Sequence, residues 1–125
     1  SDTRNRVALV NGTENGLLLS IHQNSLPSSP ATRGAFVFWN RVAGAEDLAK
    51  ALQDALNGSV NRGNEKEARQ IPDSVYLMNH VTVPGVLVEC GFLSNPEESA
   101  ALQDPAYQTR LAIAITAGIL MFRQS

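Results

Sequence analysis

Two side chains able to support metal and proton chemistry stand at the ends of short, mostly apolar runs in this sequence. His22 follows residues 17–21, and Glu89 follows residues 86–88. A neutral imidazole nitrogen can bind a metal ion, and a glutamate beside such an ion can take a proton from a water molecule. The pair is therefore a candidate for a metal-dependent hydrolase.

Each of the two residues also has a simpler interpretation. A histidine at the end of a strand is more often hydrogen-bonded within the fold than bound to metal, and Glu89 could form an ion pair with Arg33 or Arg69. A carboxylate that ends a buried apolar strand is costly unless it is paired or bound to a metal. This cost favours a functional role for Glu89 without excluding an arginine partner.

Cys90 offers a second kind of chemistry, because it could act as a nucleophile with His22 as its base. Successive residues of a strand face opposite sides of a sheet, so Cys90 and Glu89 should not both reach one site. We therefore expect Cys90 to pack against a helix as a small apolar side chain. His80 lies in a polar turn and is expected at the surface, as is the charged stretch 62–69, for which a substrate-facing lip is the alternative.

Length and composition limit the possible functions. The 125 residues suit a single domain over 1–125, and 43% hydrophobic with 18% charged residues is ordinary for a globular protein. A net charge of −2 without a basic cluster argues against a nucleic-acid partner. The apolar run 111–122 is shorter than the roughly 20 residues of a membrane span and is expected to be a buried helix. One cysteine excludes an internal disulfide, and no leader-like segment precedes the first residues.

The elements that must position these side chains follow from residue periodicity and turn signals. Helical patterns cover residues 3–10, 45–56, 96 onward and 105–122, and strand patterns cover residues 17–22, 35–39, 74–78 and 86–90. Residues 59–73 lack periodicity and are expected to form a long loop. The alternation predicts an α/β fold, a three-layer sandwich in which helices flank a twisted, mostly parallel (mixed) sheet.

The predicted fold brings the two candidate residues to one edge of the sheet. In α/β sheets ligands bind beyond the carboxyl ends of the strands, where both His22 and Glu89 are predicted to lie. The turn-rich loop 25–34 follows the first of these strands, and loops of this kind often carry substrate contacts. Asn24 and Arg33, near the two ends of this loop, are the candidates for such contacts.

Two segments resemble the signatures of a known family. Residues 19–24 read Leu-Ser-Ile-His-Gln-Asn and are similar to the Ser-Ile-His-x-Asn signature of zinc-dependent N-acetylmuramoyl-L-alanine amidases of the amidase-3 type. Residues 83–95, Val-Pro-Gly-Val-Leu-Val-Glu-Cys-Gly-Phe-Leu-Ser-Asn, look like that family's second signature. Residues 4–11, 34–38 and 107–119 extend the resemblance over nearly the whole chain. The Val-Glu-Cys-Gly-Phe variant is most similar to the sporulation and germination branch.

The resemblance implies a bacterial peptidoglycan hydrolase that acts outside the cytoplasm, in the cell wall or spore cortex. Such enzymes cleave the amide bond between N-acetylmuramic acid and L-alanine. They bind one Zn2+ through a His, a Glu and a second His, and a further Glu activates water. By motif match, His22 corresponds to the second zinc histidine and Glu89 to the catalytic glutamate. Peptidoglycan is then the expected partner.

The family's other two zinc ligands have no counterpart in this sequence. They belong to an Asp-Pro-Gly-His-Gly segment on an N-terminal strand and to the next helix, and nothing before Asp2 resembles them. We therefore expect the C-terminal portion of a catalytic domain, without the family's first strand and helix, that binds Zn2+ weakly or not at all and is inactive alone. Self-association through the surface exposed in this way is a further expectation.

A non-catalytic cell-wall module that binds glycan or peptide is the alternative from another class. A binding groove of that kind usually displays several exposed aromatic side chains. This chain has Trp39, two tyrosines and four phenylalanines, most of them within strand or core patterns. The sequence therefore favours the enzyme.

Overall fold

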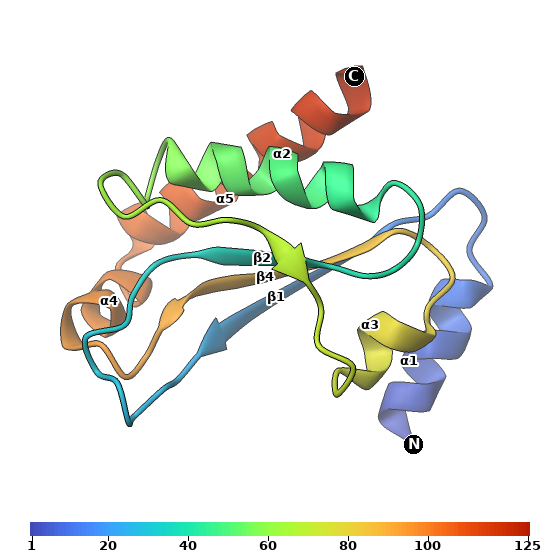
Figure 1. The fold of residues 1–125 in the computed structure, drawn as a ribbon, viewed down its shortest axis with the longest axis horizontal. Helices are drawn as coiled ribbons and strands as arrows, with labels where there is room; N and C mark the ends of the chain where they lie inside the picture. Colours follow the sequence, from blue (N-terminus) through green and yellow to red (C-terminus); the bar gives the residue numbers. More distant parts are fainter.

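The computed structural model describes residues 1–125, which form five helices and four strands (Figure 1). In chain order these are α1 (Asp2–Asn11), β1 (Leu18–Asn24), β2 (Phe36–Trp39), α2 (Ala45–Asn57), β3 (Arg69–Gln70), α3 (Tyr76–His80), β4 (Gly85–Phe92), α4 (Pro96–Leu102) and α5 (Pro105–Gln124). None of the helices is long and apolar enough to cross a membrane.

The four strands form one mixed sheet in the order β1-β4-β2-β3. β1 runs parallel to β4, β2 runs parallel to β3, and β2 is antiparallel to β4. Helices α2 and α5 cover one face of this sheet, and α1 and α3 lie on the other (Figure 1). The α/β fold with a mixed sheet flanked by helices confirms the predicted fold class.

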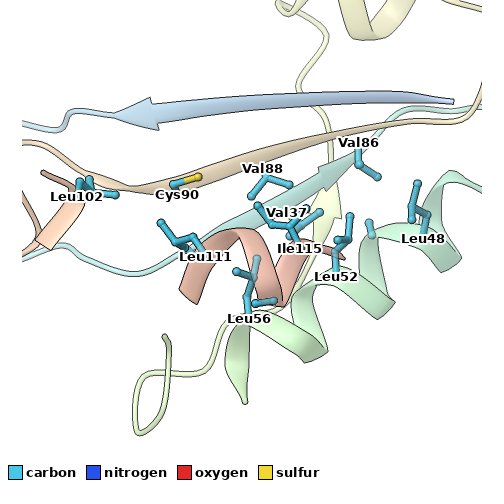
Figure 2. Packing of buried hydrophobic residues seen from close by; sticks show 13 residues of the cluster. Val37, Leu48, Leu52, Leu56, Val86, Val88, Cys90, Leu102, Leu111 and Ile115 are labelled. Carbon is cyan, nitrogen blue, oxygen red and sulfur yellow. The ribbon is translucent and has the colours of Figure 1, made fainter. Parts of the chain in front are cut away.

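The main hydrophobic core lies between the sheet and the helices α2 and α5 (Figure 2). Leu48, Leu52 and Leu56 recur along one side of α2 and are fully buried against the sheet and α5, because apolar residues spaced in this way share one helix face. The two helices approach closely at Gly118, where a Cβ atom would lie 2.8 Å from the Leu52 Cα. Cys90 is buried in this core beside Leu102 and Leu111, as expected. The stripe Leu111, Ile115, Ile119 and Phe122 also packs there.

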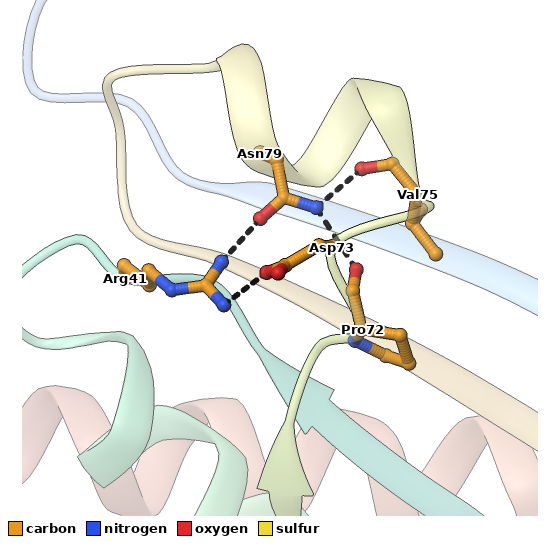
Figure 3. Close-up of polar contacts among 5 residues, drawn as sticks. All are labelled: Arg41, Pro72, Asp73, Val75 and Asn79. Carbon is orange, nitrogen blue, oxygen red and sulfur yellow. Dashed lines mark hydrogen bonds and ion pairs between the residues drawn. The ribbon is translucent and has the colours of Figure 1, made fainter.

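The expected strand over residues 74–78 is wrong, since the structure has the short helix α3 there. A short apolar run is compatible with either a strand or a turn of helix, so side-chain contacts decide which of the two forms. Asn79 Nδ2 donates to the carbonyl oxygens of Pro72 and Val75 at 2.9 and 2.7 Å, which closes the turn before the helix. Arg41 then donates to Asn79 Oδ1 and pairs with Asp73 (Figure 3). These contacts hold α3 to the segments that follow β2 and β3.

β1 is less buried than predicted, because it forms an edge of the sheet rather than an interior strand. The side chain of Ile21, for example, is 55% exposed. The final helix is likewise buried along one side only, and Ile113, Leu120 and Met121 of α5 are exposed. The expected loop over 59–73 contains the two-residue strand β3. Self-association through the surface that the family's first strand and helix would cover stays a prediction.

Candidate functional site

His22 and Glu89 lie side by side on adjacent parallel strands. The Cα atoms of the two residues are register partners in the pairing of β1 with β4. Side chains of register partners project from the same face of a sheet. This face also carries α1 and α3, which lie near the starts of β1 and β4 (Figure 1), whereas His22 and Glu89 lie in the later halves of these strands. The structure therefore brings the two predicted residues together, on a part of the sheet that no helix covers.

His22 is exposed and has one polar neighbour on its own strand. The Ser20 hydroxyl lies 2.8 Å from His22 Nε2, and the direction of that hydrogen bond depends on the histidine tautomer. Ser20 and His22 are two residues apart, so the strand directs both to the same face. An exposed imidazole oriented by a hydroxyl is available to a ligand on this face.

Glu89 is half-buried, and its Oε2 atom is buried without a hydrogen-bond partner. The ion pairs of the chain join other residues, so the suggested pairing of Glu89 with Arg33 or Arg69 is wrong. Burial raises the pKa of the Glu89 carboxyl, and the nearby His22 partly opposes this shift. A buried carboxylate oxygen that lacks a partner is costly, so Glu89 is a candidate functional residue on structural grounds as well.

An apolar groove of about 620 Å3 runs between β1 and α5 beside the core. Ile21, Cys90 and Ile115 are among the residues that line it. His22 borders this groove at the sheet edge, but Glu89 does not line it, because Glu89 points to the opposite face. His22 therefore lies between the groove and the site that it forms with Glu89, and only Glu89 is separate from the groove.

Asn24 and Arg33 lie near the two ends of the loop 25–34, as expected from the sequence. The Asn24 side chain accepts a hydrogen bond from the Ser25 amide at 2.8 Å, and its carbonyl oxygen accepts one from the Leu93 amide at 2.7 Å. Arg33 is exposed, and its carbonyl oxygen accepts a hydrogen bond from the Asn64 side chain. Their roles in binding substrate stay predictions.

The donor atoms at the site fit part of a zinc centre. The chain contains no group of three or more His, Cys, Asp and Glu side chains that could hold a metal ion. A catalytic Zn2+ needs three protein ligands and an open position. His22 could supply one imidazole ligand, and the unpartnered Glu89 carboxylate lies beside it. The residues present could therefore supply one ligand and a neighbouring carboxylate, but not a complete zinc site.

Cys90 is expected to react slowly with alkylating reagents. Burial, together with the charge of Glu89, raises the pKa of the Cys90 thiol to about 11. At pH 8 its thiolate fraction, and hence its alkylation rate, should be about a hundredfold below that of an ordinary thiol with pKa near 8.5. Iodoacetamide labelling followed by mass spectrometry measures this, with the protein unfolded in urea as the control. Rapid labelling of the folded protein at neutral pH would instead support a cysteine nucleophile.

Glu98 is a buried carboxylate that the sequence did not single out. Its side chain is 7% exposed and accepts hydrogen bonds from the Gly34 and Phe92 amides. The pattern of an acid three residues after the helix cap Asn95 was visible, but that pattern usually indicates only local capping. The long-range contact with Gly34 depends on the tertiary structure.

Comparison with known proteins places these features in a family. The model of a family described as N-acetylmuramoyl-L-alanine amidase matches residues 1–121. The germination-specific N-acetylmuramoyl-L-alanine amidase of Bacillus subtilis is 40% identical over 121 residues, which are 97% of this chain and 50% of that protein. The probable cell wall amidase LytH of Staphylococcus aureus is 32% identical over 111 residues, 83% of this chain and 34% of that protein.

Two solved structures share the fold closely. The CwlD amidase from Clostridioides difficile, solved in complex with the GerS lipoprotein, has a TM-score of 0.90 and 32% identity, with 97% of this chain and 61% of that chain covered. An N-acetylmuramoyl-L-alanine amidase from Clostridium difficile 630 has a TM-score of 0.87 and 26% identity, with 98% of this chain and 66% of that chain covered. The chain spans half the length of the Bacillus subtilis relative.

Proposed function

Because this chain belongs to the N-acetylmuramoyl-L-alanine amidase family, we propose that it forms part of a peptidoglycan hydrolase. The hydrolase cleaves the amide bond between N-acetylmuramic acid and the L-alanine of the stem peptide. The observation that carries this proposal is the register pairing of His22 with Glu89, whose buried Oε2 atom has no partner within the chain. Action in the cell wall or spore cortex, outside the cytoplasm, follows from the same proposal.

Glu89 is the general base in this proposal. It takes a proton from the water that attacks the scissile carbonyl carbon, and it returns that proton to the nitrogen of the departing L-alanine. Burial raises the pKa of the Glu89 carboxyl, and a carboxylate with a higher pKa is a stronger base than that of an exposed glutamate. Asn24 and Arg33, at the ends of the loop 25–34, are proposed to contact the substrate.

His22 is proposed as one ligand of a single Zn2+, with the Ser20 hydroxyl orienting its ring. Bound zinc would supply Lewis acidity, which polarises the scissile carbonyl group and lowers the pKa of water. The remaining ligands are proposed to come from outside residues 1–125, because no further His, Cys, Asp or Glu in the chain completes a cluster. The 125 residues alone are then inactive.

The 125-residue protein is expected to retain no stoichiometric zinc after dialysis, since one imidazole and one carboxylate do not hold the ion tightly. Elemental analysis by mass spectrometry after exposure to Zn2+ measures the content. His22→Ala and His80→Ala serve as a matched pair, because each removes one exposed imidazole. One zinc per chain that survives dialysis and is lost only in His22→Ala would show that this chain holds the metal by itself.

The test of the proposed reaction uses the holoenzyme, in which residues 1–125 are joined to the residues that supply the remaining zinc ligands, with purified muropeptides. Mass spectrometry of the products should find free stem peptides that begin with L-alanine, together with peptide-free glycan. Binding of muropeptides without release of peptide would favour the cell-wall binding module. Release of sugars or of shorter peptides would contradict cleavage at the N-acetylmuramic acid–L-alanine bond.

A further inference from the structure

The residues that follow Glu89 form a clamp on the loop 25–34. We call Gly91–Glu98 the clamp segment. It meets the loop, or the residue just before it, at four points through backbone and side-chain hydrogen bonds. These are the Leu93 amide to the Asn24 carbonyl oxygen (2.7 Å), the Leu26 amide to Ser94 Oγ (2.8 Å), Asn95 Nδ2 to the Pro30 carbonyl oxygen (3.1 Å), and the Gly34 amide to Glu98 Oε1 and Oε2 (2.9 and 3.1 Å).

Glu98 makes the most buried of these contacts. Its carboxylate also accepts a hydrogen bond from the Phe92 amide at 2.7 Å, so one side chain joins the end of β4 to the end of the loop. No lysine or arginine pairs with it, and backbone amides compensate its buried charge. A Cβ atom at Gly91 would lie 2.7 Å from Glu98 Oε1, so a glycine at this position leaves room for the carboxylate.

Local helix capping does not account for the position of the Glu98 carboxylate. Asn95 caps α4 by accepting a hydrogen bond from the Glu98 amide at 3.0 Å. An acid at this place in a helix often returns to the amide of the cap residue. Here the Asn95 amide donates to the Phe92 carbonyl oxygen instead, and the Glu98 side chain turns to the loop. The neighbouring Glu97 is exposed and makes no such contact.

The clamped loop borders the candidate site at both of its ends. It begins shortly after His22 in β1 and ends just before Phe36, the β2 residue that is paired with Glu89. Since β1 and β2 lie on either side of β4, the loop passes the carboxyl end of β4, where Figure 1 shows it beside the start of α4. Arg33 precedes the Gly34 amide that Glu98 binds.

We propose that Glu98, Ser94 and Asn95 are positioning residues, which hold the loop 25–34 so that Asn24 and Arg33 face a substrate bound at Glu89. The part that concerns substrate rests on the proposed function, whereas the clamping of the loop does not. In this proposal, the residues that follow Glu89 in the second signature have a structural role. They do not take part in the chemistry, but they attach the loop to the strand that carries the base.

Amide hydrogen exchange tests the clamp without any activity. In the folded protein, Glu98→Gln and Ser94→Ala should raise the exchange rates of the amides in residues 26–34 by roughly tenfold to a hundredfold, because each removes a hydrogen bond that holds the loop. Amides of α2 should exchange as in the wild type. The matched controls are Glu97→Gln and Ser99→Ala, and Ser94→Thr should restore slow exchange because it keeps the hydroxyl. Unchanged exchange in the loop would overturn the clamp.

Kinetics of the holoenzyme, in which the remaining zinc ligands are present, test whether the clamp positions the loop for substrate. With an N-acetylmuramoyl dipeptide, which carries the scissile bond, Ser94→Ala and Glu98→Gln should raise KM roughly tenfold and leave kcat within about twofold of the wild type. Faster amide exchange in the loop with an unchanged KM would overturn the positioning role. An equal rise of the amide exchange rates throughout the fold would overturn it too. If the wild type neither binds nor cleaves the dipeptide, the proposed function fails, while hydrogen exchange still decides whether the clamp exists.

Discussion

In the holoenzyme, in which the remaining zinc ligands are present, Glu89→Gln is expected to lower the rate of amide hydrolysis by about 10²–10⁴-fold, the usual contribution of a general base. Glutamine has the same shape but cannot take a proton from water. The change should not unfold the protein, because Glu89 Oε2 forms no hydrogen bond that would be lost. The rate of stem-peptide release at saturating muropeptide, monitored by chromatography, gives kcat. Zinc content should stay at the wild-type level, since His22 is unchanged.

The matched control for this change is Glu97→Gln, which removes a carboxylate from an exposed position on α4. Its hydrolysis rate should equal that of the wild type. A Glu89→Gln protein that stays folded, keeps its zinc and hydrolyses muropeptides at the wild-type rate would exclude Glu89 as the base. Loss of zinc in that variant would instead assign Glu89 to the metal centre as a ligand.

Leu52→Ala is expected to lower the free energy of unfolding by about 2–5 kcal/mol, the range for a leucine removed from a tightly packed core. Leu52 is fully buried between α2, α5 and the sheet, and it lies against Gly118 where the two helices come closest. The helices cannot move together to fill the space, because their backbones are already in contact there. Urea unfolding followed by circular dichroism measures the change.

Leu120→Ala is the matched control for the core, because it makes the same chemical change in α5 at a side chain that is 52% exposed. Its effect on the free energy of unfolding should stay within about 0.5 kcal/mol. Equal destabilisation by the two variants would contradict the assigned packing of α2 against α5. Since α2 packs against β2 and β4, a loss of this core would also disorder the strand that carries Glu89.

Most of the elements could be predicted from the sequence, because their signals are local. The periodic leucines of α2 and the cap at Asn95 each lie within one element and need no partner to be recognised. Alternation along β4 likewise predicted that Cys90 is directed into the core when Glu89 is directed away from it. The strand expected at 74–78 failed because a run of five residues carries too little periodicity, and contacts from Arg41 and Asn79 decide its structure.

The sequence by itself determined the family of this protein and which two residues to consider for the chemistry. The signature segments 19–24 and 83–95 contain His22 and Glu89, and residue types are properties of the chain alone. Only the tertiary structure decided that β1 is an edge strand that pairs in parallel with β4, which makes these two residues neighbours. Strand order and register arise from contacts between distant segments, and these leave no periodic trace within either segment.

Contacts between distant segments also explain why the carboxylates of Glu89 and Glu98 differ in their hydrogen-bond partners. Glu89 and Glu98 are both glutamates close to the end of one strand, and nothing in their local sequence distinguishes a free oxygen from a bound one. The fold leaves Glu89 Oε2 without a partner and gives both oxygens of Glu98 to the Gly34 amide. The partners of a carboxylate depend on which groups the folded chain places around it. For Glu98 the partner is the loop 25–34, which lies far from it in the sequence.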